Sequence, residues 1–169
     1  HVGGDWYDAV AAPADRLALV VGDVMGRGVL AATTMIRVRA GIRGLLTVDP
    51  SPRAVLSAAD EMLTRDAPDQ FVTAAAVLVD PATGALSLCN AGHIPLIVVR
   101  PDGTSDALGA ESGLPLGLGR LQDRAVITGH LEPGGLLILV TDGVVESRSH
   151  DLDCGIERLR NLAVELRDG

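Results

Sequence analysis

The sequence predicts an α+β domain built on antiparallel sheets. Strand-like and helix-like segments follow one another in blocks, which is unlike the strict alternation of a doubly wound parallel sheet. Turn signals separate several short apolar runs, as in consecutive hairpins. The chain has 169 residues, of which 47% are hydrophobic and only 2% aromatic. This composition suits one domain whose core is built from Ala, Val, Leu and Ile.

The first part of the chain is predicted to form a hairpin and two helices. Residues 2–10 and 16–23 alternate as strands around a turn at 13–15. From residue 29 to 46 apolar side chains recur at three- to five-residue steps, which indicates a helix. Ser51 follows a helix-stopping Pro and is expected to cap a second helix that ends near Arg65.

The rest of the chain is predicted to contain strands and one final helix. Residues 71–79 and 85–91 flank the turn 80–84, a strong hairpin signal. A strand is expected at 96–100 and a Gly- and Ser-rich loop at 109–119. Residues 125–131 and 136–141 are expected to pair with each other across the turn 132–135, and the last helix to run from about 155 to 167.

Charge and composition exclude several classes of function. The net charge is -8, and all 14 cationic side chains are arginines. Nucleic-acid binding needs a basic face, so we exclude it as a role. A Schiff-base lysine or a phosphate-loop lysine is excluded because the chain has no Lys. The GxGxxG spacing of a dinucleotide site is absent as well.

The cysteines and the apolar runs indicate a cytoplasmic protein without a membrane segment. Cys89 and Cys154 form no CxxC pair, so free thiols in a reducing cytoplasm are expected, although a disulfide between them stays open. No run approaches the ~20 apolar residues that span a bilayer, and no signal peptide is seen. The chain starts at His1 in place of Met, which suggests a fragment of a longer protein.

Three acids stand at the ends of apolar segments beside glycines. Asp5 follows two glycines, Asp23 ends an apolar strand, and Asp142 ends another before Gly143. Carboxylates that converge at a sheet edge repel one another unless a cation lies between them, and such ligands suit Mg²⁺ or Mn²⁺. The alternative is that each Asp only initiates a turn, which is a common use of Asp.

Four motifs follow one another along the chain, namely residues 3–8 (GGDWYD), 22–28 (GDVMGRG), 90–93 (NAGH) and 141–146 (TDGVVE). In this order they resemble the motif series of the metal-dependent protein phosphatases, the phosphatase 2C superfamily. The chain resembles the bacterial branch of sporulation and stress-response phosphatases from end to end. The resemblance implies a four-layer α/β/β/α sandwich of two antiparallel sheets between helices, with residues 1–169 as its catalytic domain.

The resemblance also implies a site and a reaction. Asp5, Asp23, the backbone carbonyl of Val24 and Asp142 are expected to hold two Mn²⁺ or Mg²⁺ ions, and a metal-activated water to attack the phosphorus. The implied substrate is phosphoserine or phosphothreonine on a regulatory protein, namely a phosphorylated anti-sigma-factor antagonist. Sensor or kinase domains are expected elsewhere in the parent chain, and a role in signal transduction and stress response follows from the same branch.

Three further residues are open to more than one interpretation. Asp8 is expected either to orient a metal-bound water or to face solvent. His93 is expected to shape the corner of its glycine turn together with Asn90, with general acid catalysis as the alternative. Arg27 is expected to approach a phosphate or simply to be solvated. Residues 113–117 (GLPLG) are expected to be structural, and the helix 29–46 to transmit a regulatory signal.

The chain departs from the family pattern at its ends. Family members carry a final strand with an Asp-Asp pair whose first Asp is a metal ligand, and no such pair follows the last predicted helix here. The strand before Val2 is short or missing as well. The sequence therefore predicts a fragment without its C-terminal strand and part of its N-terminal strand. The alternative function is a catalytically impaired regulatory or binding module of the same fold.

Overall fold

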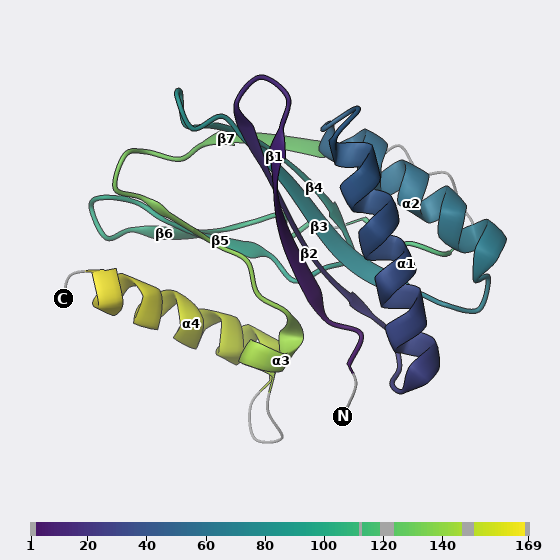
Figure 1. Cartoon of the computed structure of the whole chain (residues 1–169). Helices are drawn as coiled ribbons and strands as arrows, with labels where there is room; N and C mark the ends of the chain where they lie inside the picture. The colour runs from purple at the N-terminus through teal and green to yellow at the C-terminus, as the bar shows by residue number, and fades with distance from the viewer. Residues whose placement is uncertain (1–2, 112, 119–123, 147–150, 168–169) are drawn as a thin grey trace.

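The computed structural model of the chain describes residues 3–111, 113–118, 124–146 and 151–167. Its described strands form two antiparallel sheets (Figure 1). The five-stranded sheet has the order β1-β2-β3-β4-β7, and the three-stranded sheet has the order β6-β5-β8. The strands are β1 Trp6–Ala12, β2 Arg16–Val24, β3 Val72–Val79, β4 Ala85–Ala91, β5 Leu96–Val99, β6 Ser105–Leu108, β7 Val126–His130 and β8 Leu136–Ile138.

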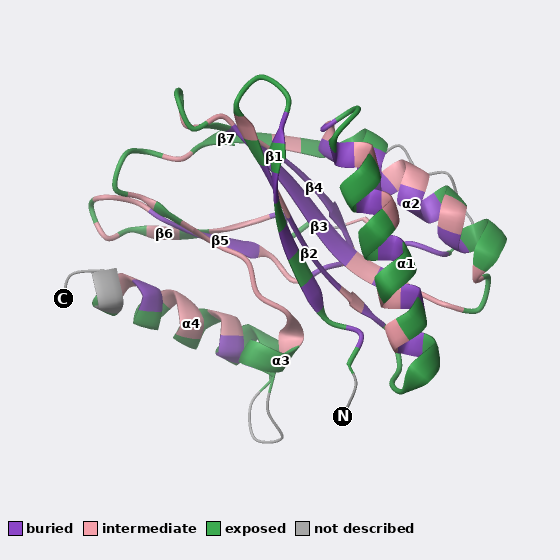
Figure 2. Ribbon diagram, viewed as in Figure 1, coloured by how far each residue is buried: buried purple, intermediate pink, exposed green. Residues whose placement is uncertain are grey.

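Helices cover the outer faces of both sheets, which confirms the predicted α/β/β/α sandwich. The helices are α1 Val29–Leu46, α2 Pro52–Asp66, α3 Asp142–Val145 and α4 Leu152–Arg167. α1 and α2 lie on the five-stranded sheet, and α4 lies along the three-stranded sheet (Figure 1). Buried residues follow the sheets and the inward faces of the helices, while the outward faces are exposed (Figure 2).

β3 shows how small side chains build two cores from one strand. Ala74 and Ala76 pack toward α1 and α2, whereas Ala75 and Val77 pack between the two sheets. All four side chains are at most 1% exposed. Successive strand residues point to opposite faces, so a strand buried on both faces is a continuous apolar run. Small side chains let layers approach closely, which explains how so few aromatics suffice.

Both long helices predicted near the N-terminus are present at the expected positions. α1 begins after Gly28, which has a positive φ of 89°, and its buried side includes Val38 and Ile42. Ser51 caps α2 as predicted, because its side chain accepts a hydrogen bond from the backbone N–H of Ala54 at 3.5 Å. The two helices then pack on the sheet through one continuous core.

The predicted pairing of residues 125–131 with 136–141 is wrong. β7 pairs with β4, for example Val126 with Cys89, while β8 pairs with β5, for example Ile138 with Ile97. The turn between them does form, since Gly135 N–H donates to the carbonyl of Glu132 at 2.8 Å. A turn sets only the local direction of the chain, and here it directs the chain from one sheet to the other.

Several element bounds also differ from the predictions. β8 ends at Ile138 in place of residue 141, and α4 begins at Leu152, earlier than expected. The short strand β6 and the one-turn helix α3 were not predicted, because neither is long enough to show a hydrophobic period. Residues 112 and 119 of the predicted loop lie outside the described residues.

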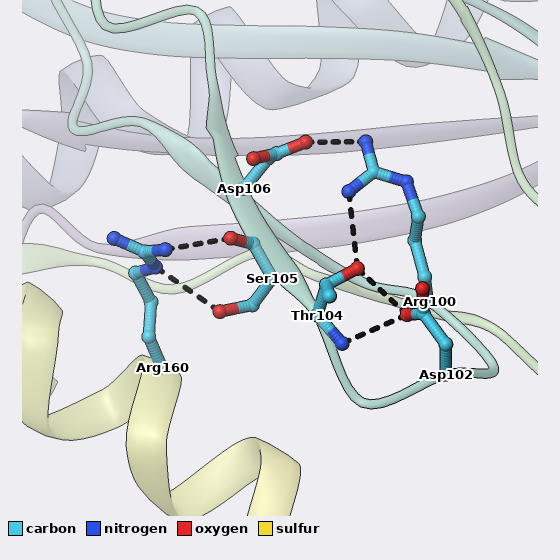
Figure 3. A network of polar contacts seen from close by, with 6 residues as sticks. All are labelled: Arg100, Asp102, Thr104, Ser105, Asp106 and Arg160. Atoms are coloured by element: carbon cyan, nitrogen blue, oxygen red, sulfur yellow. Dashed lines mark hydrogen bonds and ion pairs between the residues drawn. The ribbon is translucent and has the colours of Figure 1, made fainter.

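α4 is attached to the three-stranded sheet by apolar contacts and by polar contacts, of which Figure 3 shows the polar ones. Ala163 packs against Ile97 and Val99 of β5. Arg160 donates to the backbone carbonyl of Ser105 at 2.6 Å and to its hydroxyl at 3.3 Å. The position of α4 matters for the site, because the first turns of α4 lie against α3, which begins with Asp142.

A buried ion pair holds the segment 113–117 in place, as the structural interpretation of that segment predicted. Asp60 of α2 accepts a hydrogen bond from Arg124 at 2.7 Å and another from the backbone N–H of Gly117 at 2.7 Å. Arg124 also donates to the carbonyl of Leu114 at 2.7 Å. Leu116 then exchanges backbone hydrogen bonds with Val72 at the start of β3.

None of the helices within the described ranges is both long and apolar enough to cross a bilayer.

Candidate metal centre

Three carboxylates meet where the ends of the two sheets come together. Asp5 lies just before β1, Asp23 lies near the end of β2, and Asp142 is the first residue of α3. One oxygen from each side chain lies within 4.8 Å of the other two. Asp5 is exposed, while Asp23 and Asp142 are half-buried. The sequence thus predicted a group of acids that the fold does bring together from residues 137 positions apart.

Gly4 allows Asp5 to reach this position. A Cβ added at Gly4 would lie 2.4 Å from the carbonyl oxygen of Val24, so no other residue fits without a shift of the backbone. The Val24 N–H also donates to the Gly4 carbonyl at 3.3 Å. The two chain segments therefore touch, which places the carboxylate of Asp5 and the carbonyl of Val24 at the same corner.

Asp142 occupies the start of a helix, and its expected place at the end of a strand is wrong. After β8 ends, the chain continues irregularly to Thr141, and Asp142 then begins α3. Its carbonyl accepts a hydrogen bond from the Glu146 N–H at 2.6 Å. A Cβ added at Gly143 would lie 3.8 Å from an Asp5 carboxylate oxygen, so the first turn of α3 lies next to Asp5.

The grouping of acids is electrostatically costly without a cation. Burial raises the pKa of Asp23 to about 7, and a hydrogen bond with Asp5 and repulsion from Asp5 and Asp142 act in the same direction. With this pKa the carboxyl group is mostly protonated below about pH 7, and a bound cation would displace that proton. Hard oxygen ligands at this spacing fit Mg²⁺ or Mn²⁺, so the residues present suit the ions that the resemblance implies.

His93 is buried and both of its ring nitrogens are engaged. Nδ1 lies 3.0 Å from the hydroxyl of Thr73, and Nε2 lies 3.0 Å from the carbonyl oxygen of Val140. Burial lowers the pKa of His93, which keeps the ring neutral. A general acid must reach the substrate, and this 5%-exposed ring has no free nitrogen to do so. The geometry favours the expectation that His93 and Asn90 shape the corner over the alternative of general acid catalysis.

Asp8 lies apart from the three carboxylates and is neither exposed nor free. It is on the face of β1 that meets α1, where Arg43 binds one carboxylate oxygen at 2.6 Å and Arg39 binds the other at 3.3 Å. The expectation that it faces solvent is wrong, since it is 8% exposed. Sequence reasoning missed this pair, although two arginines four residues apart on one helix face were a visible signal.

Arg27 lies on the surface of the loop that follows β2. Its neighbours Gly26 and Gly28 have φ values of 109° and 89°, a backbone conformation that favours glycine. The loop turns the chain from the carboxylate corner into α1, and Met25 N–H anchors it to the Phe71 carbonyl at 2.9 Å. Arg27 is thus close in sequence to Asp23 and open to solvent, and its role toward a phosphate stays a prediction.

Comparisons with known proteins assign the chain to a family. A family model described as Stage II sporulation protein E (SpoIIE) matches residues 13–168. Protein IcfG of Synechocystis is 30% identical over 88% of this chain and 28% of its own length. Phosphoserine phosphatase RsbU of Bacillus subtilis is 26% identical over 89% of this chain and 45% of its own length. The chain spans less than half the length of these two relatives.

Solved structures agree with this fold. The structure of the RsbU and RsbW domains of a Mycobacterium tuberculosis protein superposes with a TM-score of 0.89 at 31% identity, over 98% of this chain and 46% of that one. The PP2C phosphatase domain of SpoIIE from Bacillus subtilis superposes with a TM-score of 0.76 at 22% identity, over 95% of this chain and 48% of that one. The second likeness concerns the fold alone.

Proposed function

The chain belongs to the SpoIIE family of PP2C-type phosphatases, and on this premise we propose that it hydrolyses phosphoserine or phosphothreonine on a regulatory protein. In this proposal Asp5, Asp23 and Asp142 hold two Mn²⁺ or Mg²⁺ ions, with the carbonyl of Val24 as a further ligand. The observation that carries the proposal is the convergence of the three carboxylates within 4.8 Å.

In this proposal the carboxylates of the chain bind and orient the metal ions, and the ions activate the water and the phosphoryl group. Bound Mn²⁺ or Mg²⁺ makes a nucleophile available from water at neutral pH and neutralises charge on the phosphoryl group. Asp5 and Asp23 hold their side of the site from the five-stranded sheet, while Asp142 closes it from the segment after the three-stranded sheet. The half-buried position of Asp23 and Asp142 limits competition from bulk water for these ligands.

The names of two relatives support a phosphoserine substrate. RsbU and RsbP of Bacillus subtilis are both named phosphoserine phosphatases. We infer a phosphorylated anti-sigma-factor antagonist as the substrate and a place in a stress-response pathway of the cytoplasm. The Mycobacterium tuberculosis protein carries an RsbW domain beside its RsbU domain, and by analogy we propose a further domain, of the sensor or kinase type, in the parent chain here.

The test is hydrolysis of p-nitrophenyl phosphate with Mn²⁺ and with EDTA, together with Mn²⁺ binding by calorimetry. We expect Mn²⁺-dependent turnover that falls at least ~100-fold in Asp142→Asn, since a ligand to the ion is lost. Asp69→Asn removes an exposed acid outside the carboxylate group and is the matched control. Binding of Mn²⁺ without hydrolysis of p-nitrophenyl phosphate would favour a regulatory module of the same fold, and absence of binding would overturn the proposal.

A further inference from the structure

The His93 side chain makes two hydrogen bonds whose direction is fixed by chemistry. Nε2 lies 3.0 Å from the Val140 carbonyl oxygen, which can only accept, so Nε2 carries the proton. Nδ1 is then an acceptor, and the hydroxyl of Thr73 donates to it at 3.0 Å. The ring is therefore a bridge with one donor end and one acceptor end, and both ends are used.

This bridge connects the two sheets at the carboxylate corner. Thr73 is on β3 and is the register partner of Asp23 on β2. Val140 lies after β8 and two residues before Asp142. β2 and β3 belong to the five-stranded sheet, whereas β8 belongs to the three-stranded one. The ring thus spans the gap that separates the acid on one sheet from the acid that follows the other.

The backbone N–H and carbonyl of His93 are also hydrogen-bonded, both to the side chain of Asn90. Asn90 accepts a hydrogen bond from the His93 N–H at 2.8 Å and donates to the His93 carbonyl at 2.9 Å. The same amide donates to the carbonyl of Gly109 at 3.0 Å, which ties a third segment to the corner. His93 and Asn90 are both 5% exposed. Buried polar groups with all partners satisfied fix one arrangement, because any other leaves a group unpaired.

We propose that His93 is a positioning residue that, through Thr73 and Val140, fixes the separation of Asp23 from Asp142 and thereby the affinity of the site for a divalent cation. The second part rests on the proposed function, whereas the first is a property of the protein without any ion. Asp142 has no strand to hold it, since β8 ends at Ile138. His93 lies in the segment between β4 and β5, and its hydrogen bonds to Val140 and Thr73 link the chain just before Asp142 to the five-stranded sheet.

The positioning is measured on the cation-free protein by amide hydrogen exchange followed by NMR. The reporters are the N–H groups of Val144 and Glu146, which donate to Thr141 and Asp142 within α3. Thr73→Val removes the hydroxyl with little change of shape, and His93→Phe removes both hydrogen bonds made by the imidazole ring. We expect exchange at the reporters to become roughly 3- to 10-fold faster in Thr73→Val and at least ~10-fold faster in His93→Phe. Thr73→Ser keeps the hydroxyl and should restore the wild-type rates.

A matched control separates positioning from loss of stability. Val77→Ala leaves a cavity on the same face of the same strand and should lower the melting temperature without selectively accelerating the two reporters. Calorimetric titration with MnCl₂ then tests the second part, with an expected ~10- to 100-fold weaker affinity in His93→Phe and no change in Val77→Ala. Reporter rates that stay at wild-type values in both Thr73→Val and His93→Phe would overturn the inference. A wild-type protein that binds no Mn²⁺ would contradict the proposed function, and the exchange rates would still decide the role of His93.

Discussion

Gly155 of α4 lies against the backbone of Val145 in α3, so closely that a Cβ at position 155 would sit 2.0 Å from the Val145 carbonyl oxygen. α3 is one turn long and begins with Asp142. α4 itself is held on the three-stranded sheet by the packing of Ala163 and by the hydrogen bonds of Arg160, which Figure 3 shows. A change at Gly155 must move α3, because the rest of α4 is held.

We expect Gly155→Ala to disturb the site through this contact. The added methyl group forces α3 and α4 apart, at a cost of about 1–3 kcal/mol in the free energy of unfolding. The displacement of Asp142 should also weaken Mn²⁺ binding, measured by calorimetry beside thermal unfolding. Gly44→Ala is the control, since Gly44 is in α1 with nothing within 4 Å of its added Cβ. That change should stabilise the protein by ~0.5–1 kcal/mol. Equal effects of the two substitutions would contradict the prediction.

The sequence predicted the parts of the fold that local pattern determines. α1 and α2 were found where their apolar period and the Ser51 cap placed them, and the β3–β4 hairpin formed across its turn. The separation of β7 and β8 into different sheets was not predictable from the sequence. Their actual neighbours, β4 and β5, are both apolar strands, and the turn between β7 and β8 does not determine which strand each of them pairs with. Strand pairing is decided by the assembled core.

The candidate site also has a part that was predictable from the sequence and a part that was not. Asp5, Asp23 and Asp142 were found because each lies beside a glycine in a motif, and a close approach requires glycine at Gly4 and Gly22. The surroundings of Asp8 and His93 were not predictable, because their partners are distant in the chain. Arg43 is 35 residues from Asp8, and Val140 is 47 residues from His93. The spacing of Arg39 and Arg43 indicates a basic face on the helix, but it does not identify Asp8 as the partner before the helix packs on the sheet.

Asp8 is predicted to stabilise the packing of α1 on β1 through its charge. Burial alone would raise its pKa, but hydrogen bonds from Arg43 and Arg39 outweigh this and lower the pKa below its usual value. Asp8→Asn keeps the shape and loses the charge, so we expect the free energy of unfolding to fall by about 1.5–3 kcal/mol in urea denaturation at pH 7.

The pH dependence of this effect has a definite sign. A carboxylate with a lowered folded pKa stabilises the protein above its unfolded pKa, and the contribution is lost as the pH falls through the folded value. The difference between wild type and Asp8→Asn should therefore be complete near neutrality and shrink below about pH 4. Asp66→Asn, which breaks the surface pair with Arg65, should change stability little at any pH. A difference that grows in acid would contradict this role of Asp8.

The buried pair of Asp60 and Arg124 is predicted to make the largest single ionic contribution to stability. Both side chains are less than a tenth exposed, and Asp60 also accepts the Gly117 N–H. Arg124→Met leaves the carboxylate buried and unpaired, which should cost about 3–5 kcal/mol of unfolding free energy. The double change Asp60→Leu with Arg124→Met should recover part of this, because no charge stays buried. Recovery will be incomplete, since the Gly117 N–H loses its acceptor. A double variant no more stable than Arg124→Met would show that lost packing causes the effect.

Asp23 is predicted to make the stability of the cation-free protein fall as the pH rises. Its pKa is about 7 in the folded protein, against 3.8 for the ordinary group, through burial and the nearby carboxylates. Between these values the folded state holds a proton that the unfolded chain has released, so raising the pH through this window favours unfolding. Asp23→Asn removes the proton and the dependence with it. The difference between the two proteins in EDTA, measured by thermal unfolding from about pH 5 to 8, isolates the contribution of this group.

Mn²⁺ should reverse the sign of that dependence, because the ion needs the carboxylate that the proton occupies. Affinity should rise about tenfold for each pH unit up to ~7 and then level off, with a proton released for each ion bound. At a concentration 100 times the Kd the ion adds about 2.7 kcal/mol to the free energy of unfolding. Calorimetry in two buffers of different ionisation enthalpy counts the released proton directly. Affinity that is constant across this range, with no proton release at pH 6, would mean that Asp23 is already ionised in the folded protein, and the electrostatic account of the site would fail.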